Sequence, residues 1–422
     1  MTQMKSRGWG LEVVSRLAFY VSPFKGVFLN NPISEWNRDF RLLALAVASQ
    51  GIFFGVQLTL FNNFIVDRLN IEAHELGYVE SLREVPGFMN AFFVALMVRF
   101  APPVVAAISL MVMGVGIMAY AQVDSVFVLA LYSLVWSVGF HCWIPMEQSM
   151  ALLFSPEGKK GKWLGQLRSV NSVAWLLSIL ICKLAYDFVG YNGLFIMAGA
   201  ATVGGGFAIL FASRKRPAHE RSFVFNRRYG LYYALNFLQG MRKQMFITFA
   251  IFALVKIHGM PVHTTMILVL MNQTLITLTA PTMGKLVDHY GERKMLSLSY
   301  IGLTFVFVGY AVVTHRPTLY VLYCVDNIIF FGGIALTTYL HKIAPESDLK
   351  PSLAMGVTMN HVASVAAPLL GGFAWHYFGY QVIFFSGAVL ALISLIVSQW
   401  VDPEGQLQRE REEMPGAAQP VS

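Results

Sequence analysis

The sequence predicts an all-α membrane protein in which twelve transmembrane helices form two pseudo-symmetric six-helix bundles. Three observations predict this fold: an apolar composition, a regular series of membrane-length apolar segments, and an internal repeat. Hydrophobic residues make up 56% of the 422 residues and charged residues only 13%, which is about half the charged share of a soluble domain.

Twelve segments are apolar enough to cross a bilayer, which takes about 20 residues of helix. They run over 40–62, 76–98, 104–121, 126–150, 163–185, 192–212, 229–256, 262–284, 295–314, 318–341, 351–373 and 380–400. Short linkers join them, except for a polar and basic stretch in the middle of the chain.

The two bundles are predicted from a repeat with an offset of 189 residues. Between 156 and 195, eleven of forty positions carry the same residue as the position 189 further on, without a gap. Chance in an apolar-biased composition would give about three or four identities. Asn171 and Asn360 match in this way, as do Gly190 and Gly379, and such pairs are expected to serve helix packing and turns common to both halves.

The spans and the repeat divide the chain into an N-terminal cytoplasmic extension, a first bundle, a basic cytoplasmic linker, a second bundle and a disordered cytoplasmic tail. Their bounds are 1–39, 40–212, 213–228, 229–400 and 401–422. Charges interrupt the extension, so it is not expected to be a cleavable signal peptide. Its segment 11–21 is amphipathic and is expected to lie as a helix on the inner membrane surface.

Basic residues predict the orientation. With both termini in the cytoplasm, the inner segments hold 22 Lys and Arg residues and the outer loops only three, Arg68, Lys256 and Arg316. Positive charge accumulates on the cytoplasmic side of membrane proteins, so we expect an integral protein of the plasma (inner) membrane. The net charge of +8 belongs to this face and is no sign of nucleic-acid binding.

A motif lies between the eighth and ninth spans. The segment 284–294 contains Gly284, Asp288, Gly291, Arg293 and Lys294, and it resembles the inner-loop signature G-x-L-x-D-x-x-G-x-R-K of the major facilitator superfamily. The glycines are expected to permit a tight turn, and Asp288 is expected to pair with a basic side chain or to cap the eleventh span. All five are therefore predicted gating residues.

The resemblance covers about 40–400 and implies alternating access around a central cavity lined by spans one, four, seven and ten. The first copy departs from the family pattern, because its loop 97–103 lacks the aspartate and the glycines. Its inner gate is expected to be held differently. The fourth and fifth spans also lack the arginine and the Gly-Pro signature of the superfamily's drug–proton antiporters.

Ionisable groups at membrane depth are costly unless they are paired or hydrated. In the first half, Glu80, Arg83 and Glu84 share one face of the second span. They form either a salt-bridge cluster that closes the outer gate, with Arg83 as a gating residue, or a proton-coupling site at Glu80 and Glu84. Glu147 and Arg168 are expected to form a structural ion pair or part of an inner gate.

In the second half, Asn236, Gln239 and Lys243 share a face of the seventh span, flanked by Arg242. Asp326 in the tenth span is expected to pair with Arg242 or Lys243, to bind a proton, or to do both in turn. By the resemblance, this region contacts substrate. The predicted substrate-binding residues are Gln50, His141, Asn236, Gln239, Arg242, Lys243, Tyr323, Asp326 and Asn327. His141 and His361 either titrate or pack through hydrogen bonds.

Differences between the copies indicate a division of labour. Glu80, Arg83 and Glu84 map onto neutral residues of the second half, whereas Arg242 and Lys243 map onto Phe53 and Phe54 of the first. The second half is thus expected to supply a cationic cavity wall, and the first half an acidic outer cluster.

Other chemistries leave no sequence signature. The chain has no Walker phosphate loop, no nucleophile elbow and no metal-spaced Cys/His set, so no enzyme, cofactor or metal is expected. We predict a monomeric, proton-coupled secondary transporter of a small organic solute, amphipathic or anionic, in the lipid bilayer, with export slightly favoured. The alternative is a non-transporting scaffold, assembly factor or receptor, which would keep Gln50, Lys243 and Asp326 dry in every state.

Overall fold

The computed structural model describes residues 32–406 and 408, apart from 98, 215–225 and 330–331. The first half contains α2 (Pro32–Glu35), α3 (Arg38–Leu69), α4 (Ala73–Phe88), α5 (Asn90–Met97), α6 (Pro102–Met118), α7 (Val126–Phe154) and α8 (Lys160–Ile209). The second contains α9 (Gly230–Lys256), α10 (Val262–Tyr290), α11 (Glu292–Val312), α12 (Arg316–Ile329), α13 (Gly332–Ile343), α14 (Glu346–Phe378) and α15 (Tyr380–Ser398). The predicted amphipathic helix at 11–21 lies outside the described residues.

Within the described ranges, nine helices are long and apolar enough to cross a membrane. One of them, α8, runs for 50 residues and bends at Gly190, so it holds two of the predicted spans. Two other predicted spans, 76–98 and 229–256, coincide with α4–α5 and α9, which carry buried charges. Each of the twelve predicted spans therefore corresponds to a helix, to part of one or, for 76–98 and 318–341, to two consecutive helices. The predicted all-α membrane fold is confirmed.

The repeat recurs in the backbone conformation of two turns. Gly190 has φ 60° and its counterpart Gly379 has φ 89°, a region that an L side chain rarely adopts. The same offset of 189 relates Asn70, with φ 46°, to Gly259, with φ 60°, and asparagine is among the few non-glycine residues that tolerate this region. The predicted common turn at Gly190 and Gly379 is confirmed.

The repeat also recurs in a helix crossing. A Cβ added to Gly51 on α3 would lie 2.7 Å from the carbonyl oxygen of Asn171 on α8. At the equivalent position in the second half, a Cβ on Gly240 of α9 would lie 3.0 Å from the carbonyl oxygen of Asn360 on α14. In both halves a glycine lets two helices approach until their backbones touch, as predicted for the matched asparagine pair.

Residues just before the first predicted bundle and just after the second pack against the helices. Glu35 lies beside Lys162, at 3.0 Å, and Lys159, at 3.7 Å, and these lysines lower the pKa of Glu35 below its usual value. Val401 is buried and Tyr339 donates a hydrogen bond to Gln406 at 3.0 Å. The ordered chain therefore continues past 400 into the segment for which the sequence predicted disorder.

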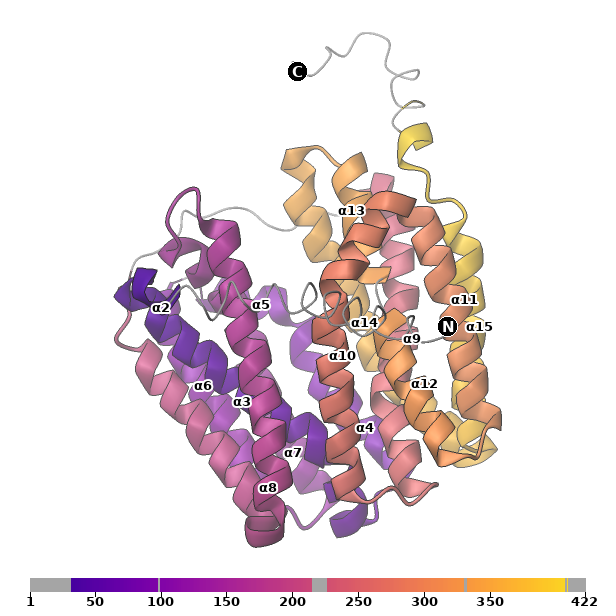
Figure 1. Cartoon of the computed structure of the whole chain (residues 1–422), viewed down its shortest axis with the longest axis horizontal. Coiled ribbons are helices and arrows are strands. Elements are labelled where there is room, and N and C mark those ends of the chain that lie inside the picture. The colour runs from indigo at the N-terminus through magenta and orange to yellow at the C-terminus, as the bar shows by residue number, and fades with distance from the viewer. Residues whose placement is uncertain (1–31, 98, 215–225, 330–331, 407, 409–422) are drawn as a thin grey trace, which may run out of the picture.

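The two halves stand side by side, with α3 and α6–α8 on one side and α9, α11, α12 and α15 on the other, while α4 of the first half lies among the helices of the second (Figure 1). The hydrogen bonds that join them gather near the end with the turns at Asn70, Gly190, Gly259 and Gly379, which we call the closed end. There Asn63 donates to the carbonyl oxygen of Met260 at 2.9 Å, and Lys256 pairs with Glu72 at 3.0 Å.

The largest contact across the halves at this end joins α4 to α14. A Cβ on Gly77 would lie 2.5 Å from the carbonyl oxygen of Pro368, and one on Gly372 would lie 2.6 Å from that of Ala73. One turn further along α4, Ser81 donates a hydrogen bond to the carbonyl oxygen of Val365 at 2.7 Å. Two glycines and a short hydroxyl side chain thus seal the closed end by bringing two backbones together.

The crossing of α4 and α14 predicts that a Gly→Ala substitution changes stability differently at two positions. Gly77→Ala should destabilise the protein by about 1–3 kcal/mol, because the added methyl group meets backbone that cannot turn aside. Gly204→Ala, in open space on α8, should be neutral or stabilising by up to about 1 kcal/mol. Thermal unfolding of the purified variants measures both, and equal melting temperatures for the two would contradict the crossing.

Candidate functional site

The Glu80 cluster consists of Glu80, Arg83 and Glu84 on α4, beside the closed end. Arg83 makes a bidentate pair with Glu80, with Nη2 to Oε2 at 2.6 Å and Nη1 to Oε1 at 2.9 Å. Its Nη2 also lies 3.1 Å from Glu84 Oε1. The spacing of three and four residues puts all three side chains on one helical face, and the salt-bridge cluster predicted from the sequence is confirmed.

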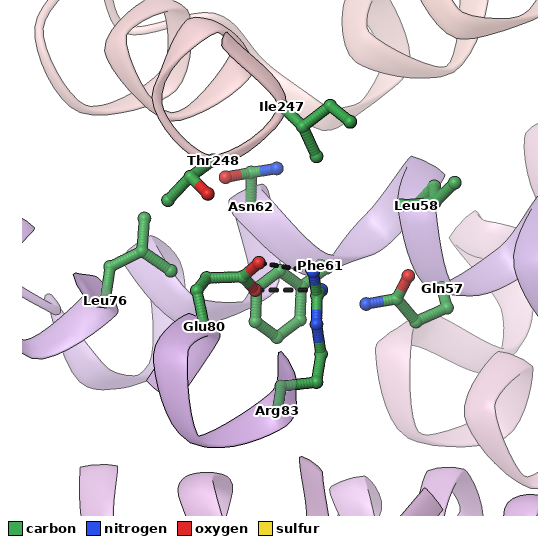
Figure 2. A pocket seen from close by; sticks show the side chains of 9 residues that line it. All are labelled: Gln57, Leu58, Phe61, Asn62, Leu76, Glu80, Arg83, Ile247 and Thr248. Carbon is green, nitrogen blue, oxygen red and sulfur yellow. Dashed lines mark hydrogen bonds and ion pairs between the residues drawn. The ribbon is translucent and has the colours of Figure 1, made fainter. Parts of the chain in front are cut away.

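A small cavity adjoins this cluster, lined by Gln57, Leu58, Phe61 and Asn62 of α3, Leu76, Glu80 and Arg83 of α4, and Ile247 and Thr248 of α9. Its volume is about 20 Å³, enough for about one water molecule. Gln57 lies on the far side of the Arg83 guanidinium from Glu80 (Figure 2). Both halves contribute to the wall, and the space is too small for an organic solute in this conformation.

Glu84 reaches across to the second half. Its Oε2 lies 3.5 Å from Nδ1 of His361 on α14, and the ring of His361 lies 5.3 Å from that of His141 on α7, measured between centroids. Ser137, one turn before His141, donates a hydrogen bond to the carbonyl oxygen of Arg83. Three helices from both halves therefore meet at Glu84, although the sequence gave no reason to connect the two histidines.

A second charged pair lies within the second half. Nη1 of Arg242 on α9 lies 3.5 Å from Oδ1 of Asp326 on α12, and the two residues are only 1% and 5% exposed. The guanidinium also lies over the ring of Phe307, 5.8 Å from its centre. Of the partners predicted for Asp326, the structure therefore selects Arg242. Lys243 is half-buried and interacts electrostatically with Glu84.

The remaining predicted substrate residues bond mostly within their own half. Asn236 donates to the carbonyl oxygen of Tyr232 at 2.8 Å, and Asn327 donates to that of Tyr323 at 2.9 Å. Gln50 accepts from Asn171 at 2.9 Å, so it supports the α3–α8 crossing. Tyr323 stacks on Phe246, and Gln239 is buried beside Gly332. None of these residues lines the small cavity beside Glu80.

The motif loop differs in part from its prediction. Gly291, with φ 81°, ends α10 and begins α11, whereas Gly284 lies inside α10, so one glycine makes the turn instead of two. Asp288, Arg293 and Lys294 are exposed. The buried acid of this loop is Glu292, which pairs with Lys342 of α13 at 2.8 Å. The sequence offered no signal for Glu292, because it fills a variable position of the motif.

Glu147 and Arg168 come from neighbouring helices, α7 and α8. Glu147 is half-buried and Arg168 is exposed, and the two interact electrostatically. Because Arg168 is exposed, this pair does not lie in the packed core of the first half.

Two repeated helical halves with charged groups buried where they meet form the architecture of secondary transporters. A family model described as Major Facilitator Superfamily matches residues 232–420. Over 149 residues the chain is 30% identical to the class C tetracycline resistance protein of Escherichia coli, covering 34% of this chain and 36% of that protein. It is also 23% identical over 157 residues to the uncharacterized MFS-type transporter YfiS of Bacillus subtilis (strain 168), covering 36% and 37%.

Solved structures match over most of the chain. The nucleoside transporter NupG superimposes with a TM-score of 0.71 at 13% identity, covering 86% of this chain and 99% of that one. An inward-facing, occupied bacterial homolog of the human lysosomal transporter Spinster gives 0.70 at 11% identity, covering 86% and 96%. At these identities the match concerns the fold, and the sequence matches span about a third of the length of the curated relatives. The fold, the motif and the family match over residues 232–420 make this chain similar to members of the major facilitator superfamily.

The Glu80 cluster predicts a large loss of stability when its arginine is removed. Arg83→Met should destabilise the protein by about 3–5 kcal/mol, because it leaves two buried carboxylates without their counter-ion. The double variant Arg83→Met/Glu80→Gln should recover part of this loss, since one of the orphaned charges is then removed. Thermal unfolding measures the difference.

The matched control for this prediction is Glu157→Gln, which breaks the exposed pair with Lys160 at 2.6 Å. It should change stability by no more than about 1 kcal/mol. A loss at Arg83→Met as small as that of the control would mean that the cluster is hydrated instead of buried.

Proposed function

We propose that this chain is a proton-coupled secondary transporter that moves a small organic anion across the membrane by alternating access. The Arg242–Asp326 pair is the observation that carries the proposal. Burying two opposite charges stabilises a protein little or not at all compared with apolar packing, and charged residues within membrane spans are typical of ion and substrate pathways. A transporter uses such a pair by breaking and re-forming it.

The chemistry of the pair suggests how coupling works. While Asp326 is ionised, it neutralises Arg242. A proton on Asp326 would remove that charge and leave the guanidinium to bind a carboxylate or phosphate of the solute, for which its planar array of donors is well suited. The half-buried Lys243, one residue further on, adds a second cation for the same anion. Proton and anion then bind together.

The orientation predicted from the basic loops makes the closed end the outer end. The described conformation would then be sealed from the outside and would face inward. Opening outward would separate α4 from α14 and break the contact between Glu84 and His361. Proton-coupling roles for Glu80 and Glu84 remain predictions from the sequence.

The direction of transport depends on how proton and solute bind. If proton and solute bind together, an inward proton gradient drives uptake of the solute. Export, which the sequence patterns favour, requires proton and solute to bind alternately. The scaffold alternative requires Gln50, Lys243 and Asp326 to be dry in every state. Asp326 is buried in this conformation, whereas Gln50 and Lys243 are half-buried, which supports transport.

Proteoliposomes with an imposed pH gradient test the proposal, using a panel of organic anions first screened for thermal stabilisation of the purified protein. The wild type should concentrate its solute by up to about tenfold per pH unit if one proton accompanies each solute. Asp326→Asn should lose this accumulation and retain exchange of labelled for unlabelled solute, because only the coupling site is altered. Asp124→Asn, in an exposed turn, should behave as the wild type.

Accumulation that survives Asp326→Asn would overturn the coupling role of this carboxylate. Transport of nothing in the panel by the wild type, together with an unaltered cellular phenotype of Asp326→Asn, would favour the scaffold. Efflux of the solute driven by an inward proton gradient would show that proton and solute bind alternately and not together.

A further inference from the structure

Two histidines and one carboxylate converge between the halves. One ligand atom each from Glu84 on α4, His141 on α7 and His361 on α14 lies within 4.8 Å of the others. Two histidines and one carboxylate form an established ligand set for zinc, with a fourth position left open. The sequence gave no hint of this set, because the three residues are separated by 57 and 220 positions.

We propose that Glu84, His141 and His361 bind a divalent transition-metal cation of the zinc class, which joins the two halves at the closed end. This site goes beyond the proposed transport function and does not depend on it, because binding can be measured without any solute.

His141 is oriented as a metal ligand. Its Nδ1 lies 2.9 Å from the carbonyl oxygen of Ser137 and 3.1 Å from the hydroxyl oxygen of the same residue. A carbonyl oxygen can only accept, so Nδ1 carries the hydrogen and Nε2 keeps its lone pair. Histidine ligands of metals almost always donate their second ring nitrogen in this way, which fixes the ring and its tautomer.

His361 offers the second nitrogen. Its buried Nδ1 has a polar neighbour in the carboxylate of Glu84, at 3.5 Å, which is too long for a well-formed hydrogen bond. Buried polar atoms rarely lack a partner. A cation between this nitrogen and Glu84 Oε2 would replace the long contact by two ligand bonds, while Oε1 of Glu84 stays paired with Arg83.

Gly87 keeps the space between the two rings free. A Cβ at this position would lie 2.5 Å from Nδ1 of His361 and 2.6 Å from Nε2 of His141. Both nitrogens therefore lie close to the same bare stretch of α4. Ligand atoms around a tetrahedral zinc ion are about 3.3 Å apart, given bonds of about 2.0–2.1 Å, so binding requires the three helices to draw together slightly.

The surrounding charges set the character of the site. Arg83 and Lys243 act on Glu84 from α4 and α9, and Glu80 neutralises much of the charge of Arg83. Nearby positive charge weakens the attraction for a cation, so the site should prefer ions with strong nitrogen affinity, such as Zn²⁺, over Mg²⁺ or Ca²⁺.

The ligands come from both halves, so the site exists only while the closed end is sealed. Glu84 and His141 belong to the first half and His361 to the second. A cation that binds all three ligands stabilises the sealed conformation. The free energy of this stabilisation equals the difference between its binding to the sealed and to the open conformation. The cation would therefore act as a clamp.

The test uses the purified full-length protein in detergent, with Co²⁺ and Zn²⁺ as the added ions. Titration calorimetry should show one Zn²⁺ per chain, and thermal unfolding should show a higher melting temperature with Zn²⁺. Co²⁺ should give the visible absorption of a tetrahedral nitrogen–oxygen site, and Zn²⁺ should bleach it. His361→Asn and Glu84→Gln should weaken binding at least tenfold, with loss of the absorption band.

A second histidine pair provides the matched control. His74 and His376 lie with their ring centroids 4.4 Å apart, and His376 is on α14 like His361. His376→Asn should leave the stoichiometry, the absorption band and the thermal shift unchanged.

Several results would overturn the site. These are no saturable binding by the wild type, binding that persists in His361→Asn, or equal losses in His361→Asn and His376→Asn. The wild-type Co²⁺ spectrum decides the outcome even if Glu84→Gln fails to fold, because a purely octahedral spectrum excludes the proposed ligand set.

Discussion

A charge that is buried between membrane helices must find an opposite charge close by, and this constraint makes α4 the central element of the protein. Arg83 holds Glu80 with two contacts and Glu84 with a third. Glu84 in turn faces His361 of the other half. The same helix makes the backbone contact with α14 at Gly77, so this one element carries both an ionic and a steric link between the halves.

The two halves satisfy this constraint differently on a common frame. Gly51 and Gly240 keep the same helix crossing, and Gly190 and Gly379 keep the same turn. The charged residues do not follow the repeat: the first half pairs its charges within α4, whereas the second half pairs Arg242 with Asp326 across two helices. A pair within one helix moves as a rigid unit, but a pair between helices can be broken when those helices shift.

Much of the fold could be predicted from sequence because its signals are local. Membrane spans need only a long apolar run, and the Glu80–Arg83 pair needs only a spacing of three residues. The Arg242–Asp326 pair was one of several options, since 84 positions separate its members. The meeting of Glu84, His141 and His361 was not predicted, because three helices must pack before these side chains approach. Gly284 was misassigned because a motif shows which residues occur and not where a helix ends.

The link at the rim of the closed end differs from the buried ones in its surroundings. Lys256 pairs with Glu72 across the two halves, and the acidic side chain is more than half exposed. Attraction between exposed charges is screened over a Debye length of about 8 Å at physiological ionic strength, while buried pairs are screened far less. The equilibrium between the sealed and the open conformation of this end therefore depends on the ionic strength of the medium on that side alone. The higher the ionic strength, the more the seal depends on the backbone contacts at Gly77 and Gly372.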